Sequence, residues 1–280
     1  MNTTRSTNWQ KDVAHVVHPY SNLDAHDTRG PLVITRGDGC YVEDDQGHRY
    51  LEGMSGLWCA SLGFSEKRLV DAAVTQLNTL PYYHLFNHRS HPPGIALAEA
   101  LTSIAPKGLN QVLFANSGSE ANDAAVKLVW YYNNQLGRPQ KKKIISRLYG
   151  YHGVTVASGS LTGLVHVHKD FDLPIPQVLH TDCPSYYHFG QPGESEAQFT
   201  ERLADNLEQL ILKEGPETVA AFIAEPINGS GGVIVPPVGY FERVQAILKK
   251  YDILFIVDEV ICGFGRTGQM FGSDSFNLKP

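Results

Sequence analysis

The sequence lacks the marks of several special classes of protein. It has four cysteines and no C-x-x-C spacing of the kind found in zinc ribbons or redox motifs. No apolar run approaches the length of a membrane span, and residues 1–20 lack the continuous apolar stretch of a signal peptide. We therefore expect reduced thiols, no zinc ribbon, no membrane association and a cytoplasmic location.

Positive charge is also scarce. The 23 lysines and arginines are outnumbered by 29 aspartates and glutamates, which gives a formal net charge of −6 at pH 7. Without a basic stripe to bind a phosphate backbone, nucleic acid is not an expected partner. The chain does have length and apolar content: 280 residues, 42% of them hydrophobic, suffice to bury a large core.

One apolar stretch near the end of the chain is the starting point for the fold prediction. Residues 253–257 are all apolar, and the run stops at the carboxylate of Asp258. A short run that is apolar at every position is typical of a strand buried on both faces of a parallel sheet. Ligands bind at the carboxyl ends of such strands, so we expect Asp258 to face a ligand.

The same arrangement recurs along the second half of the sequence. Predicted helices separate further short apolar strands, at 111–115, 143–146, 177–180 and 219–224. Three of these four strands are followed by groups that could bind a ligand, namely the turn 116–122, the loop 147–153 and Glu225. The alternation predicts an α/β fold with a mostly parallel sheet, helices on both faces, and these groups at one edge.

The first part of the chain has a different character. Residues 1–30 are polar and are predicted to form an arm that becomes ordered against another surface. Residues 39–51 alternate and predict a β-hairpin that turns at 45–47. Helices are predicted after Ser65 and over 94–104.

The turn at 116–122 allows two interpretations. Ser117, Gly118 and Ser119 precede a predicted helix, so free amides, the helix dipole and two hydroxyls converge on a point that suits an anion. A capping box between Ser117 and Glu120 would use the same residues, and the sequence leaves both interpretations open. A nucleotide-binding domain is disfavoured, because the turn has one glycine and no Walker A lysine, and no acid follows about 20 residues on.

Three histidines raise the question of a metal site. His84, His88 and His91 would share one face if the segment were helical. No H-E-x-x-H pattern and no carboxylate occur within the run, and aromatic residues are interleaved with the histidines. We therefore predict packing or pocket lining for this segment, and no metal centre.

Four motifs, in this order, resemble the class III pyridoxal-phosphate transaminases of fold type I, and most closely their omega (amine:pyruvate) branch. The motifs are Asn116-Ser117-Gly118-Ser119-Glu120-Ala121-Asn122, Tyr151-His152-Gly153, Ala224-Glu225-Pro226, and Val257-Asp258-Glu259-Val260 followed by Gly263-Phe264-Gly265-Arg266-Thr267-Gly268. The resemblance implies an N-terminal arm and small-domain β segment over 1–58 and an incomplete cofactor-binding large domain over 59–280.

The resemblance also implies a cofactor and the residues that hold it. The cofactor is pyridoxal 5'-phosphate, and the implied binding residues are Ser117, Gly118, Ser119, Tyr151, His152, Asp258 and Val260. The turn would hold the phosphate, Tyr151 and Val260 would lie on the two sides of the pyridine ring, and His152 would support the site. Asp258 would pair with the ring nitrogen and keep it protonated, because a nearby carboxylate raises the pKa of that nitrogen.

Substrates and partners follow from the same resemblance. It implies transfer of an amino group from a small amine donor to a 2-oxo acid such as pyruvate, in a homodimer. Tyr20 and Trp58 would line the amine pocket, Phe86 would be contributed across the dimer interface, and Glu225 would pair with an arginine that gates the pocket. The two aromatic residues favour a hydrophobic donor, while taurine, β-alanine and diamines stay open.

One required group is not found in the sequence. The lysine that joins the cofactor as a Schiff base is expected beyond Pro280, and Lys279 lies in the loop before that position. The resemblance also implies that two further strands of the large sheet are missing. In the family, these strands lie in the sheet between the strand that corresponds to 111–115 and the strand that ends at Asp258. We therefore interpret the chain as the N-terminal portion of a transaminase that is inactive alone. The alternative is a non-catalytic remnant that binds cofactor or a partner subunit without turnover.

Overall fold

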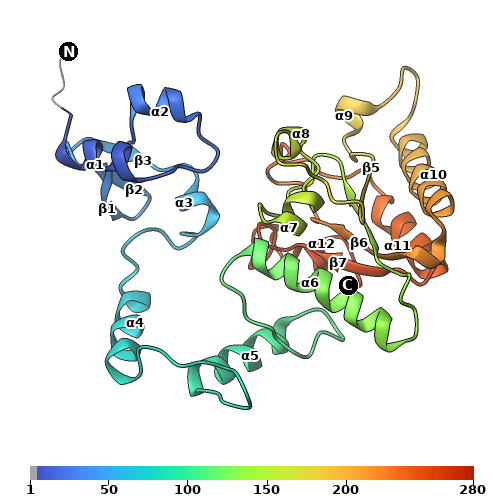
Figure 1. The fold of residues 1–280 in the computed structure, drawn as a ribbon, viewed down its shortest axis with the longest axis horizontal. Coiled ribbons are helices and arrows are strands. Elements are labelled where there is room, and N and C mark those ends of the chain that lie inside the picture. The colour runs from blue at the N-terminus through green and yellow to red at the C-terminus, as the bar shows by residue number, and fades with distance from the viewer. Residues whose placement is uncertain (1–4) are drawn as a thin grey trace. The chain divides into compact units, whose positions relative to one another are not determined.

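The computed structural model describes residues 5–280. The chain divides into two compact units, residues 1–91 and residues 92–280, and each is described here by itself. Figure 1 shows the elements of both units in chain order. None of the described helices combines the length and the hydropathy that crossing a membrane requires.

The first unit combines short helices with a small antiparallel sheet. Its elements are α1 (Thr7–His15), α2 (Leu23–Arg29), β1 (Ile34–Asp38), β2 (Tyr41–Asp44), β3 (Arg49–Leu51), α3 (Ser55–Trp58) and α4 (Lys67–Thr79). The sheet has the order β1-β2-β3, with both pairs antiparallel, which confirms the predicted hairpin. The polar segment before β1 contains α1 and α2, so much of the predicted arm is helical.

Asp44 explains why the chain turns between β2 and β3. Its side chain accepts hydrogen bonds from the backbone amides of Gln46 and His48, from His48 Nδ1 and from the Tyr50 hydroxyl, at 2.8–3.0 Å. A carboxylate that accepts several local donors fixes a turn, as in Asx motifs. The turn thus depends on one buried side chain at the end of β2.

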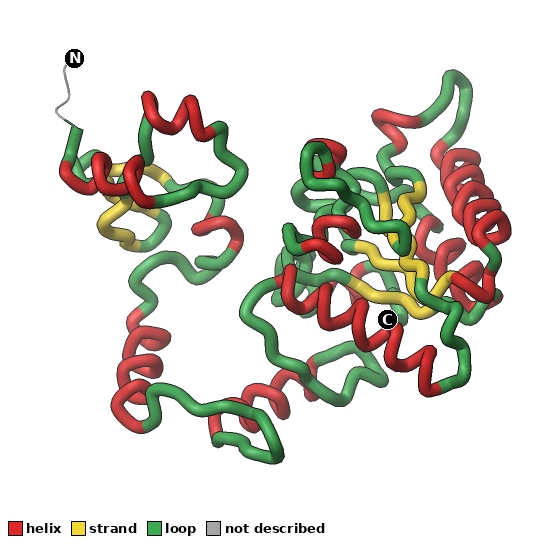
Figure 2. The backbone as a smooth tube through the Cα atoms, in the orientation of Figure 1, coloured by secondary structure: helices red, strands yellow, loops and turns green. Residues whose placement is uncertain are grey.

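The second unit is built on a parallel sheet. Its elements are α5 (Pro92–Ile104), α6 (Gly118–Gln135), β4 (Lys143–Arg147), α7 (Val156–Leu161), α8 (Val165–His168), β5 (Val178–Thr181), α9 (Tyr186–Phe189), α10 (Glu196–Glu214), the 3₁₀ turn η1 (Pro216–Thr218), β6 (Val219–Ala224), α11 (Tyr240–Lys250), β7 (Leu254–Val257) and α12 (Gly272–Ser275). The strand order is β5-β4-β6-β7, and all three neighbouring pairs are parallel. Figure 2 shows these strands surrounded by helices.

Strand β6 shows how the core of this unit is arranged. All six of its residues are buried. Phe222 belongs to an apolar cluster with side chains of α10 and α11, whereas its neighbour Ile223 belongs to a second cluster with side chains of α6 and α7. Because successive side chains of a strand point to opposite faces, the sheet is covered by helices on both faces. The predicted α/β architecture is confirmed.

Two predicted details of this unit are wrong. Residues 111–115 are not part of a strand, because no described strand lies beside them to complete a ladder; Leu113 is 67% exposed. On α6, the apolar spacing predicts a buried face made of Ala121, Ala125, Leu128 and Tyr132. The structure instead buries Asn122, Val126, Val129 and Asn133, and both asparagine side chains are hydrogen-bonded.

Candidate functional site

Three strands of the large sheet end in charged residues at one edge. Arg147 is the last residue of β4, Glu225 follows β6, and Asp258 follows β7. All three side chains are buried, and Arg147 Nη2 donates to the main-chain oxygen of Glu225 at 2.5 Å. The convergence that the sequence predicts for Glu225 and Asp258 is therefore present.

Asp258 is held as a buried, ionised carboxylate. Its Oδ2 accepts from His152 Nδ1 at 2.8 Å and from Asn122 Nδ2 at 3.0 Å, and its Oδ1 accepts from the Val260 amide at 3.1 Å. Burial alone would raise the pKa of Asp258, but the hydrogen bonds and the charge of His152 outweigh it and leave the pKa below its usual value. The site therefore holds a negative charge in a low-dielectric setting, where such a charge acts strongly on a ligand.

The loop after β4 places His152 against this carboxylate. The His152 amide donates to Thr162 Oγ1 at 2.9 Å, and its side chain is fully buried. Its Nε2 has no hydrogen-bond partner within residues 5–280. A buried nitrogen without a partner is costly, and it suggests that the site is built to receive a further group.

At the N-terminus of α6, the 116–122 turn forms only half of the predicted capping box. Ser117 is the N-cap residue, and its Oγ accepts from the Glu120 amide at 3.1 Å. The Glu120 carboxylate accepts from Asn116 instead of from the N-cap amide, so the capping box is not completed. The helix begins at Gly118, and its first amides have no acceptor within the helix, so the cap leaves donors for an anion.

Two glycines let this helix end approach its neighbours. A Cβ placed on Gly118 would lie 3.1 Å from Val260 Cγ2. A Cβ on Gly153, whose φ is +131°, would lie 2.4 Å from the hydroxyl of Ser119. The same hydroxyl accepts from the Val154 amide at 3.1 Å. Turn, loop and the segment after β7 thus meet around the start of α6.

Sequence reasoning missed two residues that tie these segments together. Asn122 Nδ2 donates to the main-chain oxygen of His152 as well as to Asp258. Asp123 Oδ1 accepts from Thr155 Oγ1 and from the Ser158 amide. Asn122 lies one helical turn beyond Gly118, and a polar residue on the buried side of a helix was the signal that could have found it.

Glu225 binds backbone on both sides of the site. Its Oε1 accepts from the Tyr151 amide at 2.9 Å, and its Oε2 accepts from the Gly229 amide at 2.8 Å. Burial raises the pKa of Glu225 above its ordinary value, although His152 and the two amides act in the opposite direction. The carboxylate thereby positions the Tyr151 loop, and Tyr151 itself is half-buried.

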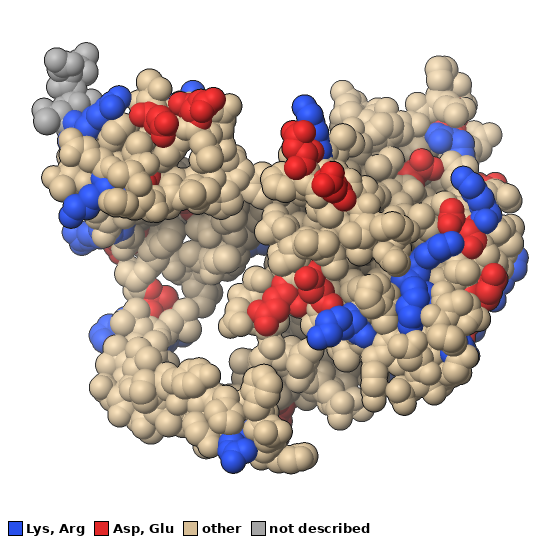
Figure 3. All heavy atoms as spheres, viewed as in Figure 1, with Lys and Arg blue, Asp and Glu red and all other residues tan. Residues whose placement is uncertain are grey.

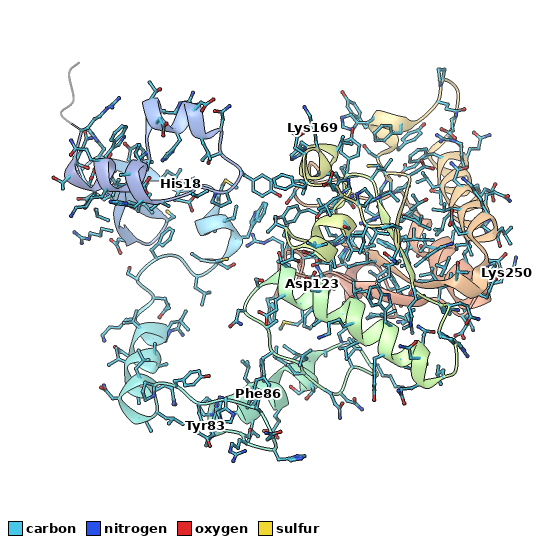
Figure 4. The ribbon with its side chains drawn as sticks, viewed as in Figure 1. His18, Tyr83, Phe86, Asp123, Lys169 and Lys250 are labelled. Atoms are coloured by element: carbon cyan, nitrogen blue, oxygen red, sulfur yellow. The ribbon has the colours of Figure 1, made fainter. Side chains whose placement is uncertain are left out.

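The remaining predicted site residues lie in the first unit. Tyr20, Trp58 and Phe86 are 64%, 38% and 78% exposed. Trp58 ends α3, a short turn whose four residues all have positive φ. The three histidines 84, 88 and 91 lie in turns and extended chain, so they do not share a helical face. Figure 4 labels Phe86 in this segment.

The fold and the site together define a class of protein. A parallel sheet covered by helices, a buried carboxylate after one strand, an anion-accepting helix N-terminus and a neighbouring aromatic residue fit pyridoxal 5'-phosphate, with its protonatable ring nitrogen and its phosphate. The architecture is that of the fold type I pyridoxal-phosphate transaminases.

Comparison with known proteins identifies the family. The family model for aminotransferase class III matches residues 23–280, and the chain belongs to this family, whose members depend on pyridoxal phosphate. The chain is 62% identical over 251 residues to "Probable gamma-aminobutyrate transaminase 2, mitochondrial" of Oryza sativa subsp. indica, which covers 89% of this chain and 50% of the relative. It is also 62% identical over 251 residues to "Vanillin aminotransferase" of Capsicum chinense, which covers 89% of this chain and 55% of the relative.

A solved structure extends the likeness to the fold. The omega transaminase from Pseudomonas jessenii in complex with PMP shares 60% identity at a TM-score of 0.97, and the match covers 98% of this chain and 61% of that chain. The chain thus spans about half the length of the curated relatives that it matches.

Proposed function

We propose that this chain is part of a transaminase whose full-length form moves an amino group from an amine donor to a 2-oxo acid such as pyruvate. The observation that carries the proposal is the buried Asp258 carboxylate, fixed by His152 and Asn122 beside the N-terminus of α6. When bound, pyridoxal phosphate supplies an electron-withdrawing ring that stabilises negative charge on the substrate carbon.

Each predicted cofactor residue has a role that its surroundings support. The amides of Gly118 and Ser119, with the hydroxyls of Ser117 and Ser119, bind the phosphate at the helix N-terminus. Asp258 holds the proton on the ring nitrogen, because its own pKa is kept low. His152 and Asn122 orient the carboxylate, so that its remaining lone pairs face the ligand.

The ring of the cofactor needs apolar contacts as well as charge. We propose that Tyr151 stacks on one side of it and that Val260 packs on the other. Val260 is 70% exposed and lies beside Gly118, so its side chain is available for this contact.

The amine donor carries its amino group on a carbon that is not attached to a carboxylate. Two relatives are named for γ-aminobutyrate and for vanillin, neither of which is an α-amino acid or an α-oxo acid. The exposed aromatic side chains of Tyr20 and Trp58 suit a donor with an apolar body. Glu225 is proposed to act at the substrate pocket by fixing the Tyr151 loop.

We propose a homodimer in which Phe86 lies at the interface. Phe86 and the nearby Tyr82 are each 78% exposed, and exposed aromatic groups of this size are typical of association surfaces. The cytoplasmic location stays a prediction, and the rice relative is named as mitochondrial.

Residues 1–280 alone are proposed to hold the cofactor without turnover. Lys279 is the one lysine after Asp258, and its Nζ donates to Asn277. The test is to titrate the 280-residue chain with pyridoxal phosphate, reduce it with borohydride, and assay amino transfer. We expect saturable binding, no stoichiometric adduct on a single lysine, and no transfer. A single stoichiometric adduct with amino transfer would overturn the lack of turnover, whereas absence of binding would overturn the cofactor site.

A further inference from the structure

A cluster of three potential metal ligands lies in the first unit. Asp12 Oδ1 is 2.7 Å from His18 Nε2 and 3.1 Å from His26 Nε2, and the three ligand atoms all lie within 4.8 Å of one another. Within residues 5–280 this is the one group of at least three such side chains in that range. It is independent of the proposed cofactor site, whose residues lie in the other unit.

The ligand types suit a borderline divalent cation. Neutral imidazole and carboxylate are common zinc ligands, at about 2.0–2.2 Å from the metal. Ligand atoms of a tetrahedral site are then roughly 3.3 Å apart. The two Asp12 distances fall short of that separation by a few tenths of an ångström, so small side-chain rotations would admit an ion.

The backbone that carries these ligands is fixed by other contacts. Asp12 is on α1 and His26 is on α2. His18, which Figure 4 labels, is on the segment between the two helices. The Arg5 side chain donates to the main-chain oxygen of Thr28 at 2.9 Å.

A second contact brings the two helices close together. Trp9 of α1 fills the space that a Cβ on Gly30, the residue after α2, would occupy. The two helices therefore hold the ligands near one another without help from a metal, and such preorganisation lowers the cost of binding.

The cluster is accessible to an ion from solvent. The side chains of His18, Asp12 and His26 are 31%, 22% and 11% exposed, so the site is neither sealed nor fully hydrated. On the face shown in Figure 3, acidic and basic side chains are interspersed over the chain. A tautomer of each histidine with its proton on Nδ1 leaves the Nε2 lone pair free to coordinate.

We propose that Asp12, His18 and His26 form a binding site for one zinc ion, with water as the fourth ligand. No short sequence motif marks this cluster, because His18 and His26 are separated by 6 and 14 positions from Asp12. The signal in the sequence is the recurrence of histidine and aspartate on two short helices and on the segment between them.

The test uses the 280-residue chain, freed of metal and titrated with Zn²⁺, and with Co²⁺ to read the geometry from its visible absorption. We expect one tight site per chain and the intense absorption of tetrahedral Co²⁺. The variant His26→Gln keeps a hydrogen-bond donor near the Nε2 position, so a cluster held by hydrogen bonds alone would persist in this variant. The substitution removes the imidazole that would coordinate the metal. Affinity should fall at least about tenfold. His88→Gln, a histidine of the same unit outside the cluster, serves as the control.

The outcomes separate the alternatives. A loss of the tight site in His26→Gln and its retention in His88→Gln support the proposal. Equal binding in all three proteins, or no tight site in the parent chain, would overturn it and leave a hydrogen-bonded cluster alone. Far-ultraviolet circular dichroism checks that each variant is folded, and Asp12→Asn provides a second ligand removal if His26→Gln does not fold.

Discussion

At the scale of single residues, the charge of Asp258 is the most consequential feature of the proposed cofactor site. Asp258→Asn keeps the shape but removes the negative charge, and a hydrogen bond to a charged group contributes about 1.5–3 kcal/mol. We therefore predict cofactor binding weaker by roughly 10- to 150-fold, measured by absorbance titration with pyridoxal phosphate. Asp252→Asn, which removes an exposed carboxylate just before β7, is the matched control and should bind normally. Equal affinities in the two variants would contradict the assignment of Asp258.

Gly153 gives a second residue-scale prediction. Its φ of +131° is strained for any side chain, and a Cβ would overlap Ser119 Oγ. Gly153→Ala should lower the free energy of unfolding of the second unit by at least about 2 kcal/mol, from strain and overpacking together. Denaturant unfolding measures this loss. Gly137→Ala also has positive φ but an open surrounding, so it should cost only about 1 kcal/mol. If both variants lose a similar free energy of unfolding, the contact with Ser119 does not explain the loss in Gly153→Ala.

Much of the cofactor site could be predicted from residue patterns, and part of it could not. Asp258 and Glu225 end apolar strands, and that pattern carries enough information to place them at one edge. Asn122 was missed because its burial depends on partners 30 and 136 positions away, which no local pattern contains. How Tyr20, Trp58 and Phe86 take part stays a prediction.

At the scale of elements, the β2–β3 hairpin depends on the ionised form of Asp44. Burial raises the pKa of this carboxyl, but hydrogen bonds from His48, Tyr50 and Gln46 outweigh it and lower the pKa to about 2. A lowered folded-state pKa stabilises the fold above the unfolded value of about 4, and this stability is lost as pH falls toward about 2. Asp44→Asn should therefore destabilise the hairpin at neutral pH.

The measurement is thermal unfolding by circular dichroism as a function of pH. The difference in melting temperature between the parent chain and Asp44→Asn should be largest above about pH 4 and should shrink as the pH falls toward about 2. Glu43→Gln, on the same strand, is the control and should leave the pH dependence in place. A difference that does not change with pH would show that packing, and not charge, fixes the turn.

The errors at this scale share one physical cause. A run such as 111–115 has the composition of a strand, but a strand forms only when a neighbour completes its ladder. The face of α6 was misjudged because hydrophobicity was the criterion, whereas hydrogen bonds allow two asparagines to be buried. The strands predicted at 143–146 and 219–224 agree with β4 and β6, because their apolar pattern matches their burial in the structure.

At the scale of the whole molecule, the parallel sheet has β5 at one edge and β7 at the other, and the behaviour of the β7 edge can be tested. Within residues 5–280, β7 pairs with β6 alone, whereas β6 pairs with both β4 and β7. The edge amides of 254–257 that point away from β6 should therefore exchange with deuterium much faster than the amides of 219–224. Hydrogen exchange of the 280-residue chain read by NMR measures this. Equal protection of all β7 amides would mean that another strand, from a second copy, covers the edge.

The bond between Asn122 and Asp258 joins residues 136 positions apart, and the bond between His152 and Asp258 joins residues 106 positions apart. Closing such loops has an entropic cost that must be met before the contact stabilises anything, so contacts of this range form late in folding. During synthesis the helix that carries Asn122 emerges long before its partner does. We expect cofactor binding during refolding to lag behind the recovery of helical circular dichroism, so that competence to bind the cofactor marks the last stage of folding.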